Sequence, residues 1–271
     1  MQAAQNVAQV FLGLNIKCAS CHDSFINDWT LKQTYALASI FSDGPMDIHR
    51  CNKPIGEKAS PAFLYPELGD VDPKASRSER VKQLAGIITS PKNGRLARTA
   101  VNRLWAIFLG RGLVEPVDEM DNLSWNQDLL DWLAVDLAQH GYDLKHTINL
   151  ILTSNAYQRP SVALGDDVKE YIFEGPVVRR MSAEQFLDGI DQVVLAASAE
   201  AKARDTGRKR AGMRNLDRLM RTLGRPKRDV VVTRRESTAT TAQLIELSNG
   251  KPLADLMTRG GQEWVKRKQG P

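Results

Sequence analysis

The chain has 271 residues, enough for one large domain or two of ordinary size and for a sizeable hydrophobic core. Its composition, 42% hydrophobic and 25% charged, is typical of a globular protein, and no run approaches the roughly 18 consecutive apolar residues of a membrane-spanning helix. The formal net charge of +5 is unevenly distributed: residues Lys202 to Arg235 include 13 Lys or Arg and three Asp, so this segment carries +10 and the remainder −5.

The first residues predict an amphipathic helix that begins abruptly. No capping residue or turn precedes the pattern, and the N-terminus has neither the basic region nor the unbroken apolar stretch of a secretory signal. We therefore expect the chain to be a fragment whose natural leader lies upstream. The apolar residues at helical spacing are Val7, Val10, Phe11 and Leu14.

Two cysteines separated by two residues follow this helix, with a histidine directly after the second: Cys18, Cys21 and His22. This spacing is that of covalent haem c attachment, in which two thiols on one short turn reach two vinyl groups and the histidine ligates the iron. Three other interpretations stay open. The pair is half of a zinc site near His49 and Cys51, a redox dithiol without the usual βαβ surroundings, or a turn that carries no cofactor.

A haem iron takes a second axial ligand or leaves that position open. The nearest candidates for a distal ligand are Met46 and His49, and a methionine would raise the reduction potential whereas a histidine would lower it. Met120, in an acidic loop, and His146, on an apolar-faced helix where a structural role is expected, are further candidates. Cys51 is expected to be a free buried thiol.

A second helix is predicted over residues 27–41, capped by Asn27 or Asp28. The stretch from Ser42 to Ser78 then holds five of the 12 prolines and predicts a long irregular connection.

Helical patterns dominate the rest of the chain. One helix has a stripe at Leu96, Ala100, Leu104 and Phe108 and ends at Gly110. An αα-hairpin follows, with Gly141 ending its first helix and Asp143 capping its second. Ser182 to Gln185 is a capping box, Asn249-Gly250 separates two later helices, and the best strand signal is Val230 to Thr233. The fold class is mainly α: irregular multi-helix domains with a long proline-rich connection and little strand.

The basic segment from Lys202 to Arg235 would meet an anionic partner or lie as a solvated or internally paired face. Nucleic acid is disfavoured as the partner, because no aromatic residue lies between Phe186 and Trp264. A docking surface for an acidic redox protein is a further interpretation, between a solvated or internally paired face and a nucleic-acid-binding segment. The arginines expected on one helical face are Arg210, Arg214, Arg218 and Arg221.

Signatures of the common enzyme classes are missing from the sequence: it has no P-loop, no nucleophile elbow and no HExxH. The acids Asp118, Glu119 and Asp121 would serve acid–base chemistry only if buried together, and they are expected to be solvated. Whether the chain is an enzyme is left open by the sequence.

Several motifs resemble known families. FLGLNIKCASCHD and WTLKQTYALASIF are similar to the cytochrome-C-like domain of large exported planctomycete-type proteins. AVNRLW, GRGLVEP, LLDWLA, YDLKH and LTSNAYQ resemble the domain of unknown function that follows it, and residues 219–250 resemble its closing part. In that family a further histidine often follows the motif closely, where Ser24-Phe25 stands here.

The resemblance implies two domains: 1–60, the end of a cytochrome-C-like domain with the CxxCH motif, and 78–271, a helical domain of unknown function. It implies one covalent haem c held by Cys18, Cys21 and His22, in a periplasmic or otherwise exported protein. The leading hypothesis is electron transfer to or from a partner redox protein. The alternative is a non-catalytic binding or structural module of the cell envelope with an unloaded CxxCH turn.

Overall fold

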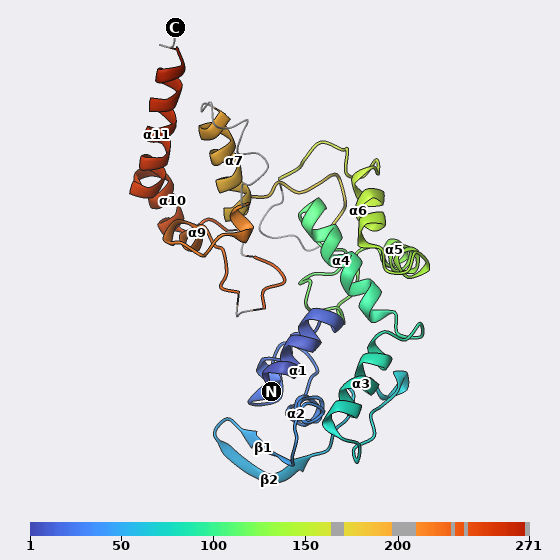
Figure 1. The fold of residues 1–271 in the computed structure, drawn as a ribbon. Coiled ribbons are helices and arrows are strands. Elements are labelled where there is room, and N and C mark those ends of the chain that lie inside the picture. The colour runs from blue at the N-terminus through green and yellow to red at the C-terminus, as the bar shows by residue number, and fades with distance from the viewer. Residues whose placement is uncertain (164–170, 197–209, 229–230, 236–237, 269–271) are drawn as a thin grey trace. The chain divides into compact units, whose positions relative to one another are not determined.

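The computed structural model describes residues 1–163, 171–196, 210–228, 231–235 and 238–268. It divides into two compact units, Met1–Val178 and Arg179–Pro271, so residues on both sides of the predicted boundary at 60–78 share the first unit. The mainly α fold class is confirmed, since the strands of the described residues form one two-stranded sheet (Figure 1). Within these residues, no helix has the length and apolar character needed to cross a membrane.

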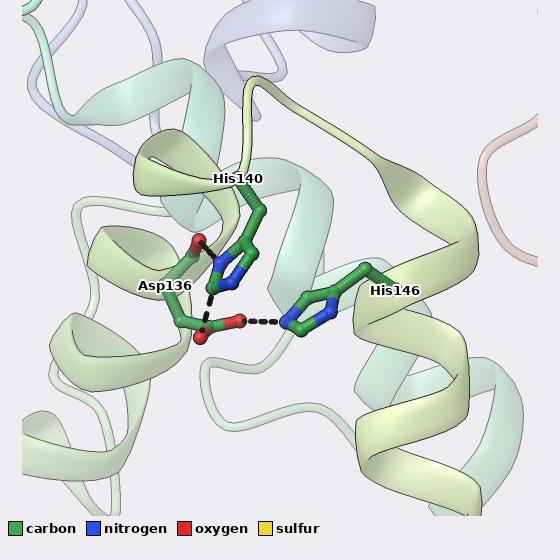
Figure 2. Close-up of side chains that lie close together, drawn as sticks. All are labelled: Asp136, His140 and His146. Carbon is green, nitrogen blue, oxygen red and sulfur yellow. Dashed lines mark hydrogen bonds and ion pairs between the residues drawn. The ribbon is translucent and has the colours of Figure 1, made fainter.

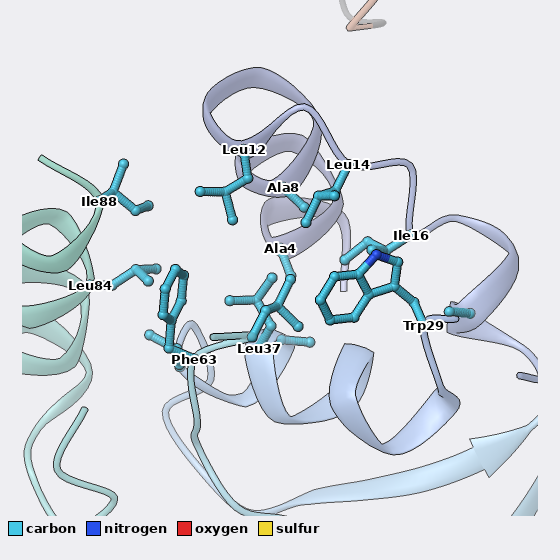
Figure 3. Close-up of a cluster of buried hydrophobic side chains, with 14 of the residues drawn as sticks. Ala4, Ala8, Leu12, Leu14, Ile16, Trp29, Leu37, Phe63, Leu84 and Ile88 are labelled. Atoms are coloured by element: carbon cyan, nitrogen blue, oxygen red, sulfur yellow. The ribbon is translucent and has the colours of Figure 1, made fainter. Parts of the chain in front are cut away.

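The chain begins with α1 (Gln2–Val7), which continues into a π-helical turn, η1 (Ala8–Leu12). Gly13 ends this segment with φ +62°, and a Cβ there would overlap the Met120 side chain. The predicted apolar face is partly wrong: Phe11 is 43% exposed. The wider π turn rotates the chain, and the buried side chains are those of Ala4, Ala8, Leu12 and Leu14 (Figure 3).

The next helix, α2 (Leu31–Ser39), begins later than expected. Its N-cap is Thr30, which forms a capping box with Gln33, so the predicted cap at Asn27 or Asp28 is wrong. Asn27 is used instead in tertiary contacts, because its side-chain amide donates to the backbone oxygen of Asn15.

The proline-rich stretch is less irregular than predicted. It contains the antiparallel hairpin β1 (Met46–Arg50) and β2 (Lys53–Ala59), and a short 3₁₀ turn, η3 (Pro66–Leu68). Cys51 stands in the turn of the hairpin with φ +54°. Helix α3 (Arg77–Ile88) follows, with Ser76 as N-cap. Its Leu84 and Ile88 pack with α1 and α2 around Leu37 and Phe63 (Figure 3).

The second core of unit 1 lies between α4 (Arg95–Leu109), α5 (Gln127–Gln139) and α6 (Leu144–Leu152). Gly110 ends α4 with φ +85°, and Asp143 caps α6, both as predicted. The predicted stripe on α4 is displaced by one residue, since the buried apolar residues are Ala97, Val101, Trp105 and Leu109.

Unit 2 is formed by α7 (Ala183–Ala196), η4 (Ala211–Met213), α9 (Arg218–Thr222), α10 (Thr241–Asn249) and α11 (Lys251–Lys268). The capping box before α7 is confirmed, because Ser182 and Gln185 exchange two hydrogen bonds. The break at Gly250 is confirmed too. The strand predicted at Val230 to Thr233 is not formed: Val230 lies outside the described residues, and residues 231–233 are irregular.

Candidate functional site

The CxxCH motif forms a tight turn. Cys18 begins a 3₁₀ helix, η2 (Cys18–Ser20), and its carbonyl accepts hydrogen bonds from the backbone N–H groups of Cys21 at 3.2 Å and His22 at 3.4 Å. Cys21 directly follows the last residue of η2, so the two thiols stand at the two ends of this turn. Both thiols are free and exposed.

The His22 ring is half-buried and has a defined orientation. Its Nδ1 lies 2.7 Å from the backbone oxygen of Asp23, and its ring centroid lies 4.5 Å from that of Phe25. Because a carbonyl only accepts hydrogen bonds, Nδ1 carries the proton. The lone pair is therefore on Nε2, which is the arrangement that metal-ligating histidines adopt.

The tip of the β1–β2 hairpin is fixed to this turn. The backbone N–H of Cys51 donates to the carbonyl of Cys21 at 2.9 Å, and Arg50 pairs with Asp23 at 3.3 Å. The other carboxylate oxygen of Asp23 accepts from the backbone N–H of Leu31 at 2.9 Å, which ties the turn to α2. Cys51 is exposed, so the expectation of a buried thiol is wrong: its place in the hairpin turn keeps it at the surface.

The predicted distal ligands lie in different surroundings. His49 is two residues from Cys51 on β1, is half-buried, and has its Nδ1 3.0 Å from the backbone oxygen of Asp47. Met46 starts the same strand and packs with the cluster of Leu31, Tyr35 and Ile48. His49 is thus closer in the chain than Met46 to the hairpin tip that contacts the CxxCH turn.

The two further candidates are engaged in other contacts. The sulfur of Met120 lies 3.3 Å from the Asn102 amide, and the Met120 side chain packs against the second core. His146 contacts Asp136.

Two exposed apolar side chains follow the motif. Phe25 is 87% exposed and Ile26 is 64% exposed.

Asp118 and Glu119 are half-buried, which corrects the expectation that these acids are solvated, whereas Asp121 is exposed as expected. Asp118 pairs with Arg103 at 2.9 Å, and their side chains are only 17% and 16% exposed. Asp121 pairs with Arg95 at 2.6 Å. Glu119 accepts a hydrogen bond from Asn27 at 3.1 Å, and burial raises the pKa of its carboxyl. These contacts indicate a structural role.

A cluster of potential metal ligands that the sequence analysis missed lies in the αα-hairpin. Asp136, His140 and His146 come together at the end of α5 and the start of α6 (Figure 2). Within the described part of the chain, this is the one group of three such residues whose ligand atoms lie within 4.8 Å of one another. The available signal was an Asp and a His four residues apart, followed by an Asp-capped helix.

The arginines of the basic segment do not form one helical face, because η4 and α9 are separate short elements. Arg214 pairs with Asp191, and both Arg225 and Arg235 pair with Glu184. These three arginines thus share two carboxylates inside unit 2, which offset two of their three charges. Lys202 to Lys209 lie outside the described residues.

Comparison with protein-family models gives two matches. Residues 1–45 match PSCyt2, a protein of unknown function (DUF1549), and residues 80–215 match PSD1, a protein of unknown function (DUF1553). These are the planctomycete-type domains that the motifs resemble, and neither match is to a cytochrome c domain. Searches of the curated proteins and of the solved structures found no match. Because the match to residues 80–215 covers half of the chain, the protein belongs to the PSD1 family of proteins of unknown function (DUF1553).

Proposed function

We propose that this chain is an exported electron-transfer protein that holds one covalent haem c at Cys18 and Cys21, with His22 as the axial ligand. One observation carries the proposal: two exposed free thiols stand at either end of a short turn, next to a histidine whose Nδ1 is held by a backbone oxygen. The haem would supply one-electron chemistry at its iron.

The residues of the turn have separate roles in this proposal. Each thiol adds its sulfur and its hydrogen across one vinyl group, so a thioether forms and no atom is lost. The backbone oxygen of Asp23 keeps the proton of His22 on Nδ1 and so orients Nε2. Phe25 and Ile26 supply exposed apolar area that would exclude water from the bound group.

His49 is the better distal candidate of the two in the hairpin. Its strand is fixed to the CxxCH turn by the bond from Cys51 to Cys21, whereas Met46 would have to leave a hydrophobic cluster to present its sulfur. A histidine in that position lowers the reduction potential relative to a methionine.

An acidic redox partner that docks on the segment Lys202 to Arg235 stays a prediction. Arg214, Arg225 and Arg235 are engaged internally, so the docking charge would come from the segment's other basic residues.

The second candidate function is a non-catalytic binding or structural module of the cell envelope. The observation that favours it is the set of contacts around Asp23 and Cys51, which would hold the turn in place without a cofactor.

The two functions are separated by a test for covalent haem. The chain is expressed with an export signal in a host that matures haem c, and the purified protein is run on a haem-stained denaturing gel. We expect a stained band for the natural sequence and for C51A, which serves as the thiol control, and none for the C18A/C21A double variant. A folded chain with a cooperative unfolding transition and no stained band would contradict the haem proposal and support the structural module.

A further inference from the structure

We propose that Asp136, His140 and His146 form a binding site for a divalent first-row transition-metal ion, with Zn²⁺ as the expected ion. The site lies in the PSD1 segment and is independent of the CxxCH turn. The three side chains point toward one another from two helices (Figure 2).

The separations within the cluster are close to those of a metal site. His146 Nε2 lies 2.9 Å from one carboxylate oxygen of Asp136, and His140 Nδ1 lies 3.3 Å from the other. Ligand atoms about 2.0–2.1 Å from a tetrahedral Zn²⁺ are about 3.3 Å apart. Small side-chain rotations would therefore replace two hydrogen bonds with bonds to the ion.

The backbone that carries these ligands is fixed. Gly141 and Tyr142 have φ +64° and +62°, so the chain reverses direction within four residues. The N–H of His140 donates to Asp136, that of Tyr142 to Leu137, and that of Asp143 to His140. Asp143 then accepts hydrogen bonds from the backbone N–H groups of Lys145 and His146. Ligands on rigid elements lose little conformational entropy on binding an ion.

The donor set selects the class of ion. Two imidazole nitrogens and one carboxylate oxygen suit zinc and its first-row neighbours, whereas Mg²⁺ and Ca²⁺ prefer oxygen ligands alone. Three protein ligands leave one tetrahedral position open for water or a small anion. The site is accessible, because the side chains of His140 and His146 are 47% and 34% exposed.

Binding of the ion requires no release of a ring proton from the two histidines. In the ion-free protein, Nδ1 of His140 donates to the backbone oxygen of Asp136 at 2.8 Å. Where the ion takes the nitrogen that faces the carboxylate, the proton moves to the other ring nitrogen and the imidazole stays neutral. The rings lie face to face, with centroids 3.8 Å apart and planes at 15°, so one ring has to turn before both in-plane lone pairs meet a single ion.

The test uses the full chain with the C18A, C21A and C51A substitutions, which remove competing thiol ligands. Zn²⁺ is titrated in competition with a chromophoric chelator, and Co²⁺ is added in parallel to record its visible absorption. We expect one equivalent of Zn²⁺ to bind, and a Co²⁺ spectrum with the intense bands of four-coordinate geometry. D136N and H146Q should each weaken binding by at least about 100-fold, more than the 10–100-fold typical of losing an outer-shell partner.

The matched control is D128N, which removes an exposed carboxylate in the first turn of α5, outside the cluster, and should leave binding unchanged. H140Q, at an exposed position, gives a third ligand variant should D136N fail to fold. Absence of stoichiometric binding in the thiol-free chain would overturn the proposal. So would binding that H140Q and H146Q leave unchanged, because the ion would then lie elsewhere. The thiol-free variant cannot attach haem c, because attachment requires Cys18 and Cys21. Neither result therefore depends on the haem proposal.

Discussion

Asn102 is expected to be one of the residues on which unit 1 most depends. It is fully buried on α4, and its side chain makes two hydrogen bonds with the backbone of a single residue, Val114. The Asn102 amide donates to the Val114 carbonyl at 3.0 Å, and the Val114 N–H donates to the Asn102 oxygen at 2.9 Å. Val114 is only 1% exposed, so water has little access to either group.

The substitution N102A removes both partners of Val114. A buried backbone group left without a hydrogen bond costs about 1–3 kcal/mol, so the two together should lower the free energy of unfolding by about 2–6 kcal/mol. The upper end applies if the chain around Val114 does not relax. Since domains of this size are typically stable by about 5–15 kcal/mol, the loss is a large fraction of the total.

The assay is equilibrium unfolding in urea, followed by tryptophan fluorescence, because Trp105 and Trp125 belong to the same core as α4. The matched control is N122A. Asn122 is exposed and its side chain donates one hydrogen bond, to the backbone oxygen of Glu115 at 3.0 Å, so losing that side chain should cost less than about 0.5 kcal/mol. If N102A costs less than about 1 kcal/mol, the reasoning from unsatisfied backbone groups fails.

Three further predictions concern buried charge. Arg225 is 6% exposed and binds three carbonyl oxygens as well as Glu184. R225M should therefore destabilise unit 2 by about 3–5 kcal/mol, measured by hydrogen exchange. R228M, at an exposed position, is the control and should have little effect. Burial raises the pKa of Glu119, so the natural chain loses stability as the pH rises through that pKa. E119Q should be the more stable variant in urea at pH 7, and an advantage that persisted at pH 3 would contradict this. The hydrogen bond from Arg235 lowers the pKa of Glu184. The contribution of the Glu184 carboxylate to the free energy of unfolding is therefore complete above about pH 4.3, the ordinary pKa of a glutamate, and is lost as the pH falls through the lowered pKa. Thermal melts of E184Q should therefore show destabilisation at pH 7 that shrinks toward pH 3, and a constant difference would refute it.

Local signals predicted the helices and several of their ends. Gly110, Asp143 and the Ser182 capping box act within a few residues of themselves, so the sequence alone identified them. The N-cap of α2 was missed because Asn27 is drawn into contacts with Asn15 and Glu119, which lie elsewhere in the chain.

Tertiary geometry decided the remaining features. The buried stripe of α4 is displaced by one residue because the positions of α5 and α6 select the face that packs. The β1–β2 hairpin was hidden by the prolines around it, and its turn is at Cys51 rather than at a glycine. The Asp136 cluster depends on the angle of a turn, which residue spacing does not reveal.

The paired acids of residues 118–121 have a consequence for how the protein can be divided. Asp118 accepts hydrogen bonds from the side chains of Gln9 and Arg103. The backbone of Glu119 forms an antiparallel β-bridge with that of Leu14. Asp118, Arg103 and Glu119 lie in the PSD1 match, whereas Gln9 and Leu14 lie in the PSCyt2 match. A gene fusion or truncation that separated the two matches would remove the contact of Gln9 with Asp118. It would also remove the packing of the Met120 side chain against Gly13. Residues 1–45 and the part of the PSD1 match up to Val178 therefore belong to one compact unit and should be kept together in any shortened variant.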